Sequence, residues 1–248
     1  MILEAKNLCK VFETARVKAV QDISFGIERG KTLGVAGESG SGKSTLAKLV
    51  LRLLPMDSGE IYFKGRLVSR APETKLKDFR KKVQVIFQEP FLSLDPRMKV
   101  KDILREPFLV QGEPNTKALE EKVRTLLLRV ELPESFSYKF PRQMSGGECQ
   151  RVAIARAISR DPELVVCDEP VSSLDAIAQV QILNLLLKLQ KEQNAAFLFI
   201  SHDLKIVRHM SDDILVMKEG RLCEIGPRET VFQNPQHPYT RLLIQNLR

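Results

Sequence analysis

The sequence of 248 residues lacks the long apolar run that a membrane-spanning helix requires. It has only four cysteines, at positions 9, 149, 167 and 223, and no C-x-x-C pair. This spacing excludes a disulfide framework and a zinc-binding cysteine pair, and it predicts buried thiols in a reducing compartment. The N-terminus carries no signal-peptide pattern, so we expect the protein in the cytoplasm.

Internal repeats and low-complexity segments are also absent. The length allows one large domain or two small ones, and a composition of 43% hydrophobic and 28% charged residues is ordinary for a folded protein. The net charge of +8 is compatible with nucleic acid, anionic lipid headgroups or nucleotide phosphates as partners. The locally basic run at 75–82 is explained better by a solvated helix face.

The most informative segment fits the P-loop pattern G-x-x-x-x-G-K-[ST]. It consists of Gly37, Glu38, Ser39, Gly40, Ser41, Gly42, Lys43, Ser44 and Thr45. An apolar strand at 32–36 precedes it, and apolar residues at helical spacing follow it, namely Leu46, Leu49, Val50, Leu53 and Leu54. Strand, glycine loop and helix in this order predict a phosphate-binding site, whereas a chance glycine-rich turn would lack the flanking elements.

The residue types of this loop suit a nucleoside triphosphate with Mg²⁺. Glycines let backbone N–H groups turn towards phosphate oxygens, and the helix N-terminus adds partial positive charge. Lys43 can reach the β- and γ-phosphates, and the Ser44 hydroxyl can ligate Mg²⁺. The loop therefore predicts that a nucleoside triphosphate and Mg²⁺ bind here.

A second apolar strand, 164–168, ends in two carboxylates, Asp168 and Glu169. A P-loop enzyme needs an acid at such a strand end to hold Mg²⁺, which is the role predicted for Asp168. Glu169 is the next residue, so its side chain points away from the face of Asp168 and can polarise the attacking water as general base. Without the P-loop, the same pattern would indicate only an exposed turn.

Ser145, Gly146, Gly147 and Glu148 precede an Arg-rich helix. Ser145 can cap this helix, and the glycines expose its first N–H groups. The segment is either a second anion site, distant in sequence from the P-loop, or a simple helix cap.

Around these motifs an α/β pattern is interrupted by helices. Residues 89–160 show helical periodicity with many prolines, and one apolar stripe consists of Leu119, Val123, Leu126, Leu127 and Val130. On either side we expect strands at 83–87, 164–168, 196–200, 213–217 and 221–225 and a helix at 177–192. The predicted organisation of residues 1–248 is a core of 1–88 and 161–225, a helical insert of 89–160, and a tail of 226–248 ending in an amphipathic helix.

Taken together, the motifs resemble the ATP-binding-cassette (ABC) ATPase family along nearly the whole chain. They are the P-loop, Ser145-Gly146-Gly147, Asp168-Glu169-Pro170, Ser173-Leu174-Asp175 and Ser201-His202-Asp203. The resemblance implies an α/β P-loop NTPase (RecA-like) core with an antiparallel β subdomain and an inserted helical subdomain.

The resemblance also implies roles for single residues. Two related ATPase subunits, identical or different, would form a head-to-tail dimer, in which each ATP meets one subunit's P-loop and the other's segment 145–148. Gln88 corresponds to the glutamine that touches Mg²⁺, Glu169 to the catalytic base and His202 to the histidine at the γ-phosphate. Phe12 corresponds to the aromatic residue that stacks on adenine, and the loop at Asp175 crosses the dimer interface.

Residues 144–148 depart from the family pattern at their first and last positions. Met144 replaces the usual leucine, a volume-conserving change that should be tolerated. Glu148 replaces the usual glutamine and adds negative charge near the partner's nucleotide, although an acid is favourable in the first turn of a helix. We expect weaker ATP affinity at that site without loss of activity.

Two further segments indicate the subfamily. Residues 87–98, with Ser93-Leu94-Asp95-Pro96-Arg97, and residues 234–243, with His237-Pro238-Tyr239-Thr240, are similar to the ATPases of dipeptide, oligopeptide and nickel importers. One histidine beside two prolines makes a poor metal site, so we reject His237 as a ligand. A cysteine-bearing extension found in many peptide-importer relatives is absent, which favours the shorter nickel-importer ATPases.

Such an importer would pair this chain with two membrane permeases and, indirectly, an extracytoplasmic solute-binding protein, at the cytoplasmic face of the membrane. The alternative is an ABC ATPase without permeases that acts on nucleic acid or in translation. The net charge is compatible with that alternative, whereas the single cassette and the absence of a long coiled coil and of a zinc-binding cysteine pair oppose it. A regulator without hydrolysis is disfavoured because Lys43 and Glu169 are both present. We expect no specific nucleic-acid partner.

Overall fold

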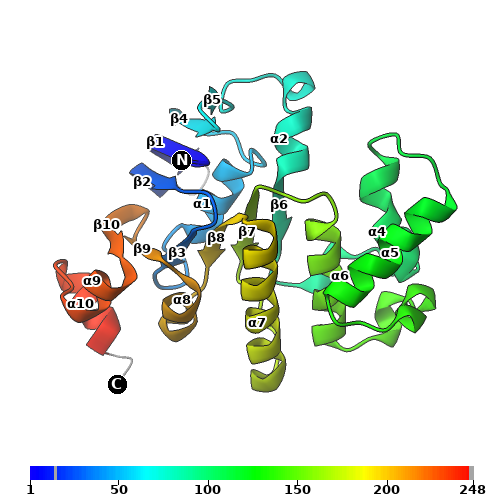
Figure 1. Cartoon of the computed structure of the whole chain (residues 1–248). Coiled ribbons are helices and arrows are strands. Elements are labelled where there is room, and N and C mark those ends of the chain that lie inside the picture. The colour runs from blue at the N-terminus through cyan, green and yellow to red at the C-terminus, as the bar shows by residue number, and fades with distance from the viewer. Residues whose placement is uncertain (14–15, 246–248) are drawn as a thin grey trace. The chain divides into compact units, whose positions relative to one another are not determined.

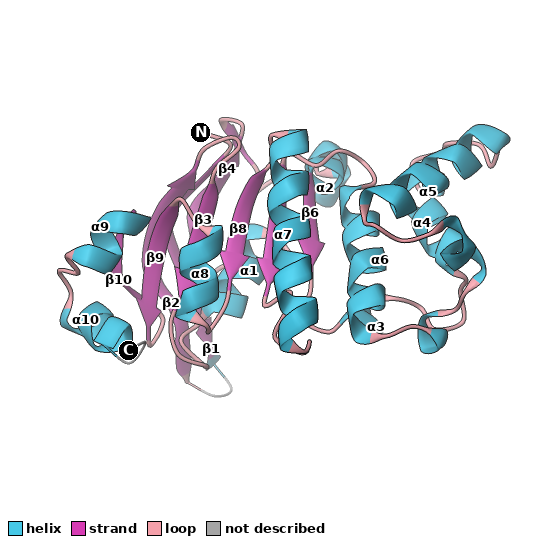
Figure 2. Cartoon of the chain, turned by 60° about the horizontal axis from the view of Figure 1, so that its bottom comes forward, coloured by secondary structure: helices cyan, strands magenta, loops and turns pink. Residues whose placement is uncertain are grey.

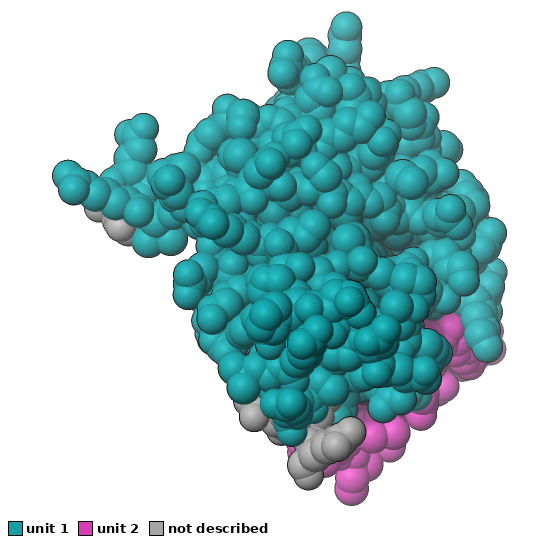
Figure 3. Space-filling model, turned by 90° about the vertical axis from the view of Figure 1, so that its left-hand side faces the viewer, with its two compact units in different colours: residues 1–85, 163–169, 190–248 teal, residues 86–162, 170–189 magenta. Residues whose placement is uncertain are grey.

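The computed structural model describes residues 1–13 and 16–245 (Figure 1). The last three residues of the expected tail 226–248 therefore lie outside the described range. The chain divides into two compact units, coloured separately in Figure 3. The first consists of residues 1–85, 163–169 and 190–248, and the second of residues 86–162 and 170–189.

A mixed sheet forms the framework of the first unit (Figure 2). Its strands, in the order in which they lie side by side, are β5 (Arg66–Leu67), β4 (Ser58–Phe63), β1 (Leu3–Phe12), β2 (Val17–Ile27), β10 (Arg221–Pro227), β9 (Asp213–Lys218), β3 (Thr32–Ala36), β8 (Ala196–Ile200), β7 (Leu164–Asp168) and β6 (Val83–Ile86). The central strand β3 pairs in parallel with both β8 and β9, and β7 pairs in parallel with β8. β1 pairs antiparallel with β2 and β4, so the expected α/β core with an antiparallel β region is confirmed.

Apolar side chains of β9 point alternately to the two faces of the sheet and so contribute to two hydrophobic cores. Successive side chains of a strand point to opposite faces. Leu215 and Met217 join the larger core, which also contains the apolar face of α1 (Lys43–Val50). Ile214 and Val216 join a smaller core on the other face, with residues of α8 (Leu204–Met210), α9 (Arg228–Gln233) and α10 (Pro238–Gln245). The tail helix expected at the C-terminus therefore belongs to the core of the first unit.

Helix α1 is shorter than the apolar stripe predicted. It ends at Val50, and Arg52 adopts the left-handed conformation with φ of 55°. Because this turn redirects the chain, Leu53 lies outside the helix and is 55% exposed. Leu46, Leu49 and Val50 are buried as expected.

The second unit is helical. Its elements are α3 (Pro90–Ser93), α4 (Val100–Leu109), α5 (Lys117–Arg129), η3 (Glu134–Tyr138), η4 (Pro141–Gln143), α6 (Gly146–Ile158) and most of α7 (Ala176–Gln193). Within this unit α4, α5 and α6 pack on one another. The apolar stripe predicted in 119–130 is buried, which confirms it.

The unit boundaries differ from the expected insert of 89–160 by a few residues at each end, since residues 86–88 and 161–162 also belong to the second unit, and by one larger segment. Residues 170–189, expected in the core 161–225, group with the helices of the second unit. Helix periodicity along α7 gives no signal of which neighbours its apolar face meets, so the pattern alone could not reveal this. The assignment of 1–248 as one cassette domain stays a prediction.

The four cysteines are free, as expected, but only two are fully buried. Burial raises the pKa of Cys149 to about 11 and that of Cys167 still further. Cys9 and Cys223 are partly exposed, on β1 and β10. Within residues 1–13 and 16–245, no helix is both long and apolar enough to span a membrane.

Candidate nucleotide-binding site

The P-loop connects β3 to α1, and its glycines are required by close contacts. Gly37 has φ of 153°, and a Cβ atom there would lie 2.3 Å from the Met217 carbonyl oxygen. Gly42 has φ of 102°, and its Cβ atom would lie 2.1 Å from the Ala19 carbonyl oxygen. Because backbone carbonyl groups of β2 and β9 lie against the loop, a side chain at Gly37 or Gly42 would force the backbone to move.

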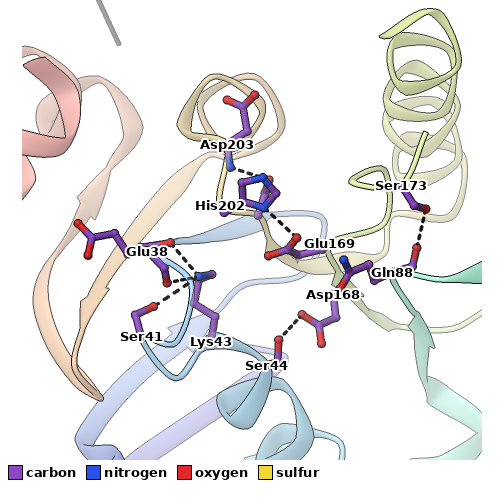
Figure 4. A network of polar contacts seen from close by, with 12 residues as sticks. Glu38, Ser41, Lys43, Ser44, Gln88, Asp168, Glu169, Ser173, His202 and Asp203 are labelled. Carbon is purple, nitrogen blue, oxygen red and sulfur yellow. Dashed lines mark hydrogen bonds and ion pairs between the residues drawn. The ribbon is translucent and has the colours of Figure 1, made fainter. Parts of the chain in front are cut away.

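Lys43 folds back under the loop (Figure 4). Its Nζ donates to the carbonyl oxygens of Gly37 and Glu38, both at 2.8 Å, and contacts the Ser41 hydroxyl at 3.4 Å. Burial lowers the pKa of Lys43, and the nearby carboxylates of Glu169, Asp168 and Glu38 oppose this shift. The buried ammonium is thus held at the loop by oxygen acceptors that phosphate oxygens can replace.

Ser44 and Asp168 meet in the first unit. The Ser44 hydroxyl donates to Asp168 Oδ1 at 3.0 Å. Burial raises the pKa of Asp168, while the hydrogen bond from Ser44 lowers it and the charge of Glu169 raises it further. A hydroxyl and a carboxylate are oxygen ligands that suit a hard divalent cation such as Mg²⁺, so these two residues fit the predicted metal role.

Glu169 and His202 form a second pair beside Lys43 (Figure 4). Nδ1 of His202 lies 2.8 Å from Glu169 Oε2, and Glu169 adopts a left-handed φ of 50° directly after β7. The adjacent carboxylates of Asp168 and Glu169 therefore have different partners, as the alternation along the strand indicated. His202 is 55% exposed, which leaves its ring accessible.

The loop after β8 also fixes the helix next to His202. Ser201 Oγ accepts the N–H of Asp203 at 3.0 Å. The Asp203 carboxylate caps α8 by accepting the N–H groups of Lys205 and Ile206. Residues 201–203, singled out in the sequence as a motif, thus act locally as a turn and a helix cap.

In the second unit, Ser145 caps α6, as predicted. Its Oγ accepts the Glu148 N–H at 3.2 Å, and Glu148 Oε2 accepts the Ser145 N–H at 2.7 Å. This reciprocal capping box was missed in the sequence, although its S-x-x-E signature is present. A Cβ atom on Gly146 would lie 3.2 Å from Leu174, and one on Gly147 3.4 Å from Ala178, so the segment packs closely on the loop and helix after β7.

The other predicted residues have the following surroundings. Gln88 follows β6 in the second unit, and its carbonyl oxygen accepts the Ser173 hydroxyl at 3.2 Å. Asp175 caps α7 through the N–H groups of Ile177 and Ala178. Phe12 ends β1 and is 38% exposed, with the Lys10 ammonium 5.9 Å from the ring centroid.

A pocket of about 700 Å³ adjoins the P-loop at Gly40. It is lined by basic side chains from β2, the turn before it, β9 and β10, namely Arg16, Lys18, Lys218 and Arg221. A concentration of positive charge beside a phosphate-binding loop favours a polyanionic ligand. These four basic residues were not predicted, because they come from segments that adjoin only in the folded sheet.

Comparison with protein families gives two matches. Residues 20–172 match the family described as ABC transporter. Residues 223–248 match the family described as oligopeptide/dipeptide transporter, C-terminal region. The second match covers the segment that contains the His237-Pro238-Tyr239 motif.

Relatives of known function match over most of their length. The oligopeptide transport ATP-binding protein AppF of Bacillus subtilis is 43% identical, covering 99% of this chain and 78% of the relative. The dipeptide transport ATP-binding protein DppF of Haemophilus influenzae is 46% identical, covering 92% and 70%.

Solved structures agree in fold. CbiO1 of Clostridium perfringens, part of an ABC transporter complex, has a TM-score of 0.84 at 28% identity, over all of this chain and 95% of that one. The ATP-binding cassette MJ0796, a dimer bound to ADP and phosphate, has a TM-score of 0.82 at 27% identity, over 91% and 98%.

Proposed function

This chain belongs to the ABC transporter family, among the ATP-binding proteins of oligopeptide and dipeptide transporters, and we propose that it powers the import of peptides. It is an ATPase that hydrolyses ATP for transport. The observation that carries the proposal is the cluster of Lys43, the pair Ser44–Asp168 and the pair Glu169–His202 within one compact unit.

In the proposed mechanism, the P-loop N–H groups and Lys43 bind the β- and γ-phosphates of ATP. Ser44 and Asp168 would hold Mg²⁺, which when bound neutralises phosphate charge. Glu169 accepts a proton from the water that attacks the γ-phosphorus, and the bond to the leaving β-phosphate oxygen breaks. The contact at 2.8 Å between His202 Nδ1 and Glu169 Oε2 orients that carboxylate. The roles of Gln88 as a further Mg²⁺ ligand and of Phe12 under adenine remain predictions.

The proposed assembly is a head-to-tail dimer of this chain with itself or with a related ATPase. Each ATP would contact residues 37–45 of one subunit and residues 145–148 of the other. Ser145 is exposed, as this arrangement requires. Ile177 and Val180, at the start of α7, are 74% and 58% exposed, and such large apolar side chains favour an interface.

The dimer would dock on two permeases at the cytoplasmic face of the membrane and receive solute through an extracytoplasmic binding protein. ATP closes the dimer and hydrolysis reopens it, so that binding energy in one interface becomes motion in another. The relatives are named for oligopeptides and dipeptides, which supports peptides as solute over the nickel that the short tail had favoured.

Affinity purification from native membranes tests the proposal. A tagged Glu169→Gln chain with ATP, which holds the dimer shut, should recover two multi-span permeases and an ATPase partner. The matched Lys43→Ala chain should bind no ATP and serves as the control. The same complex, assembled with the unmodified chain in membrane vesicles, should then take up labelled dipeptide when ATP is supplied. Recovery of only nucleic acid, with a steep salt dependence of binding, would contradict transport and support the alternative ATPase without permeases.

A further inference from the structure

The Glu224 carboxylate holds the turn between α9 and α10. Glu224, on β10, accepts the N–H of Gln236 at 2.9 Å and the N–H of His237 at 3.0 Å. Arg241 ties the other end of the same turn by donating to the carbonyl oxygens of Pro235 and Gln236. The turn that precedes α10 is therefore fixed to the sheet at its backbone.

The His-Pro-Tyr motif then starts α10 in a defined direction. His237 Nδ1 accepts the N–H of Tyr239 at 3.1 Å, which satisfies a donor at the helix start. Pro238 is the first residue of α10, a position that proline favours because it needs no N–H there. The outcome is that the Tyr239 side chain enters the protein instead of facing solvent, with only 5% of its surface exposed.

The Tyr239 ring lies in the smaller core of the first unit. That core also contains Ala36, the last residue before the P-loop, and Leu204 and Val207 of α8, the helix that follows His202. The Lys218 ammonium lies 4.8 Å from the ring centroid. The tail thus packs on the elements that carry both the phosphate loop and the predicted γ-phosphate contact.

The Tyr239 hydroxyl contacts the P-loop itself. It accepts the backbone N–H of Glu38 at 3.3 Å, while the carbonyl oxygen of Glu38 accepts Lys43 Nζ at 2.8 Å. The residue Glu38 is therefore held from the tail on its N–H and by the phosphate-binding lysine on its carbonyl. Burial raises the pKa of Tyr239, so the phenol stays protonated at neutral pH.

We propose that Tyr239 is a positioning residue of the P-loop, and that the tail 234–241 holds this loop in its nucleotide-binding conformation. A loop held in place before ATP arrives loses less conformational entropy on binding. Loss of the hydroxyl should therefore weaken ATP binding and leave the chemical step intact. This inference rests on the proposed function, since it concerns the same nucleotide site.

The test is Tyr239→Phe, which removes one oxygen and keeps the buried ring. Tyr62→Phe is the matched control, because Tyr62 lies in the same unit, bonds Glu60 through its hydroxyl at 2.7 Å and has the Lys6 ammonium 5.0 Å from its ring. ATP affinity of the full-length chain is measured with a fluorescent ATP analogue, with steady-state hydrolysis and thermal unfolding in parallel. For Tyr239→Phe we expect the Kd and KM for ATP to rise about two- to tenfold, the range of one neutral hydrogen bond, with kcat and Tm unchanged.

The outcomes separate the two hypotheses. If the unmodified chain binds no ATP, the proposed function fails. If the unmodified chain binds ATP and Tyr239→Phe binds it as tightly as Tyr62→Phe does, the positioning role is overturned. A fall in Tm with no change in KM would also overturn it, because Tyr239 would then be only a core residue. A second variant, Glu224→Gln, leaves Tyr239 intact but weakens its anchor, and it should raise KM in the same direction.

Discussion

The two adjacent carboxylates of the candidate nucleotide site have different hydrogen-bond partners, which indicates different roles. Glu169 is held by His202 at 2.8 Å and lies one residue beyond Asp168, whose carboxylate is engaged with Ser44. We therefore predict that Glu169 acts as the base, whereas the Asp168 carboxylate is engaged with the Ser44 hydroxyl. This difference leads to a prediction for the amide variant.

Glu169→Gln should lower kcat for ATP hydrolysis by about 10²–10⁴-fold, because an amide cannot accept the proton of the attacking water. ATP binding should remain, since Lys43 and the loop are unchanged. Hydrolysis is measured by phosphate release and binding with a fluorescent ATP analogue. The control His202→Gln should retain more activity, as it removes a positioning contact and not the base. Full activity in Glu169→Gln would assign the base elsewhere.

Glu148 can be tested without damage to its helix. Glutamine can accept the Ser145 N–H as Glu148 does at 2.7 Å, so Glu148→Gln removes the charge and keeps the capping box. If this residue faces the partner's nucleotide, ATP affinity of the dimer should rise about two- to fivefold through loss of charge repulsion. Glu148→Ala is the control, and it should also destabilise α6, by about 1 kcal/mol. Unchanged affinity in the glutamine variant would disprove the electrostatic role.

Local sequence patterns predicted most of the candidate site residues. They missed residues whose contacts join segments far apart in the sequence. The P-loop and the Asp168-Glu169 pair are each contiguous in sequence, so their roles could be predicted once the P-loop supplied the context for the two carboxylates. Tyr239 approaches Glu38 across 201 positions of the chain, and no local pattern encodes such a contact. The capping box of Ser145 and Glu148 was readable in principle, but the departure of Glu148 from the family pattern drew attention to its charge alone.

At the scale of elements, strands were predicted better than the ends of helices. β3, β7 and β8 have the predicted bounds because each is a short, mostly apolar run that a sheet covered on both faces can bury. Helix α1 was predicted too long. The apolar residues after Val50 keep the helical spacing although the chain turns there. The partners of α7 were not predictable, since they depend on tertiary packing.

The tail elements depend on Glu224 in a way that pH can reveal. Burial tends to raise the pKa of Glu224, but the N–H groups of Gln236 and His237 outweigh it, and the net pKa is lowered from 4.5. A lowered carboxyl pKa contributes stability that is present above the unfolded value and lost as pH falls through the folded value. The protection factors of the backbone amides in residues 234–241, which correct for the intrinsic pH dependence of exchange, should therefore be high at neutral pH and fall below about pH 4.5.

Glu224→Gln is the variant that checks this assignment. This variant should remove the pH dependence of the protection factors in residues 234–241. It should also lower the protection of the Gln236 and His237 N–H groups at neutral pH. The control is Glu229→Gln, because Glu229 lies in the same tail but bonds Arg228 and Gln233 side chains. Equal exchange in the two variants would show that Glu224 does not hold the tail.

For the whole molecule, the fold class followed from motif order, whereas the partition into two units did not. Each motif fixes its own neighbourhood, and the membership of residues 170–189 emerges only from the contacts of the complete chain. The same limit applies to assembly. The segment 145–148 and the P-loop belong to different units, and the dimer hypothesis gives the exposed Ser145 a predicted role beyond capping α6.

Mixing two inactive variants tests that hypothesis. Lys43→Ala removes the phosphate-binding ammonium, and Gly147→Asp places a carboxylate where the partner's phosphates are expected. The second change should fold, because an acid is favourable in the first turn of α6 and its Cβ atom would lie 3.4 Å from Ala178. In a head-to-tail homodimer, an equal mixture gives one complete site in each mixed dimer. Since half of randomly formed dimers are mixed, about a quarter of the unmodified ATPase rate should return.

Two controls make this result decisive. Each variant alone should hydrolyse no ATP above background, and both should unfold at the temperature of the unmodified chain. A mixture of Lys43→Ala with Glu169→Gln should not recover, because both defects lie on the P-loop side of the site and every site then contains one of them. Recovery in that mixture would mean that the catalytic groups are shared between subunits differently from the head-to-tail arrangement. No recovery in the first mixture, from chains that regain activity when a related ATPase is added, would make the heterodimer the working assembly.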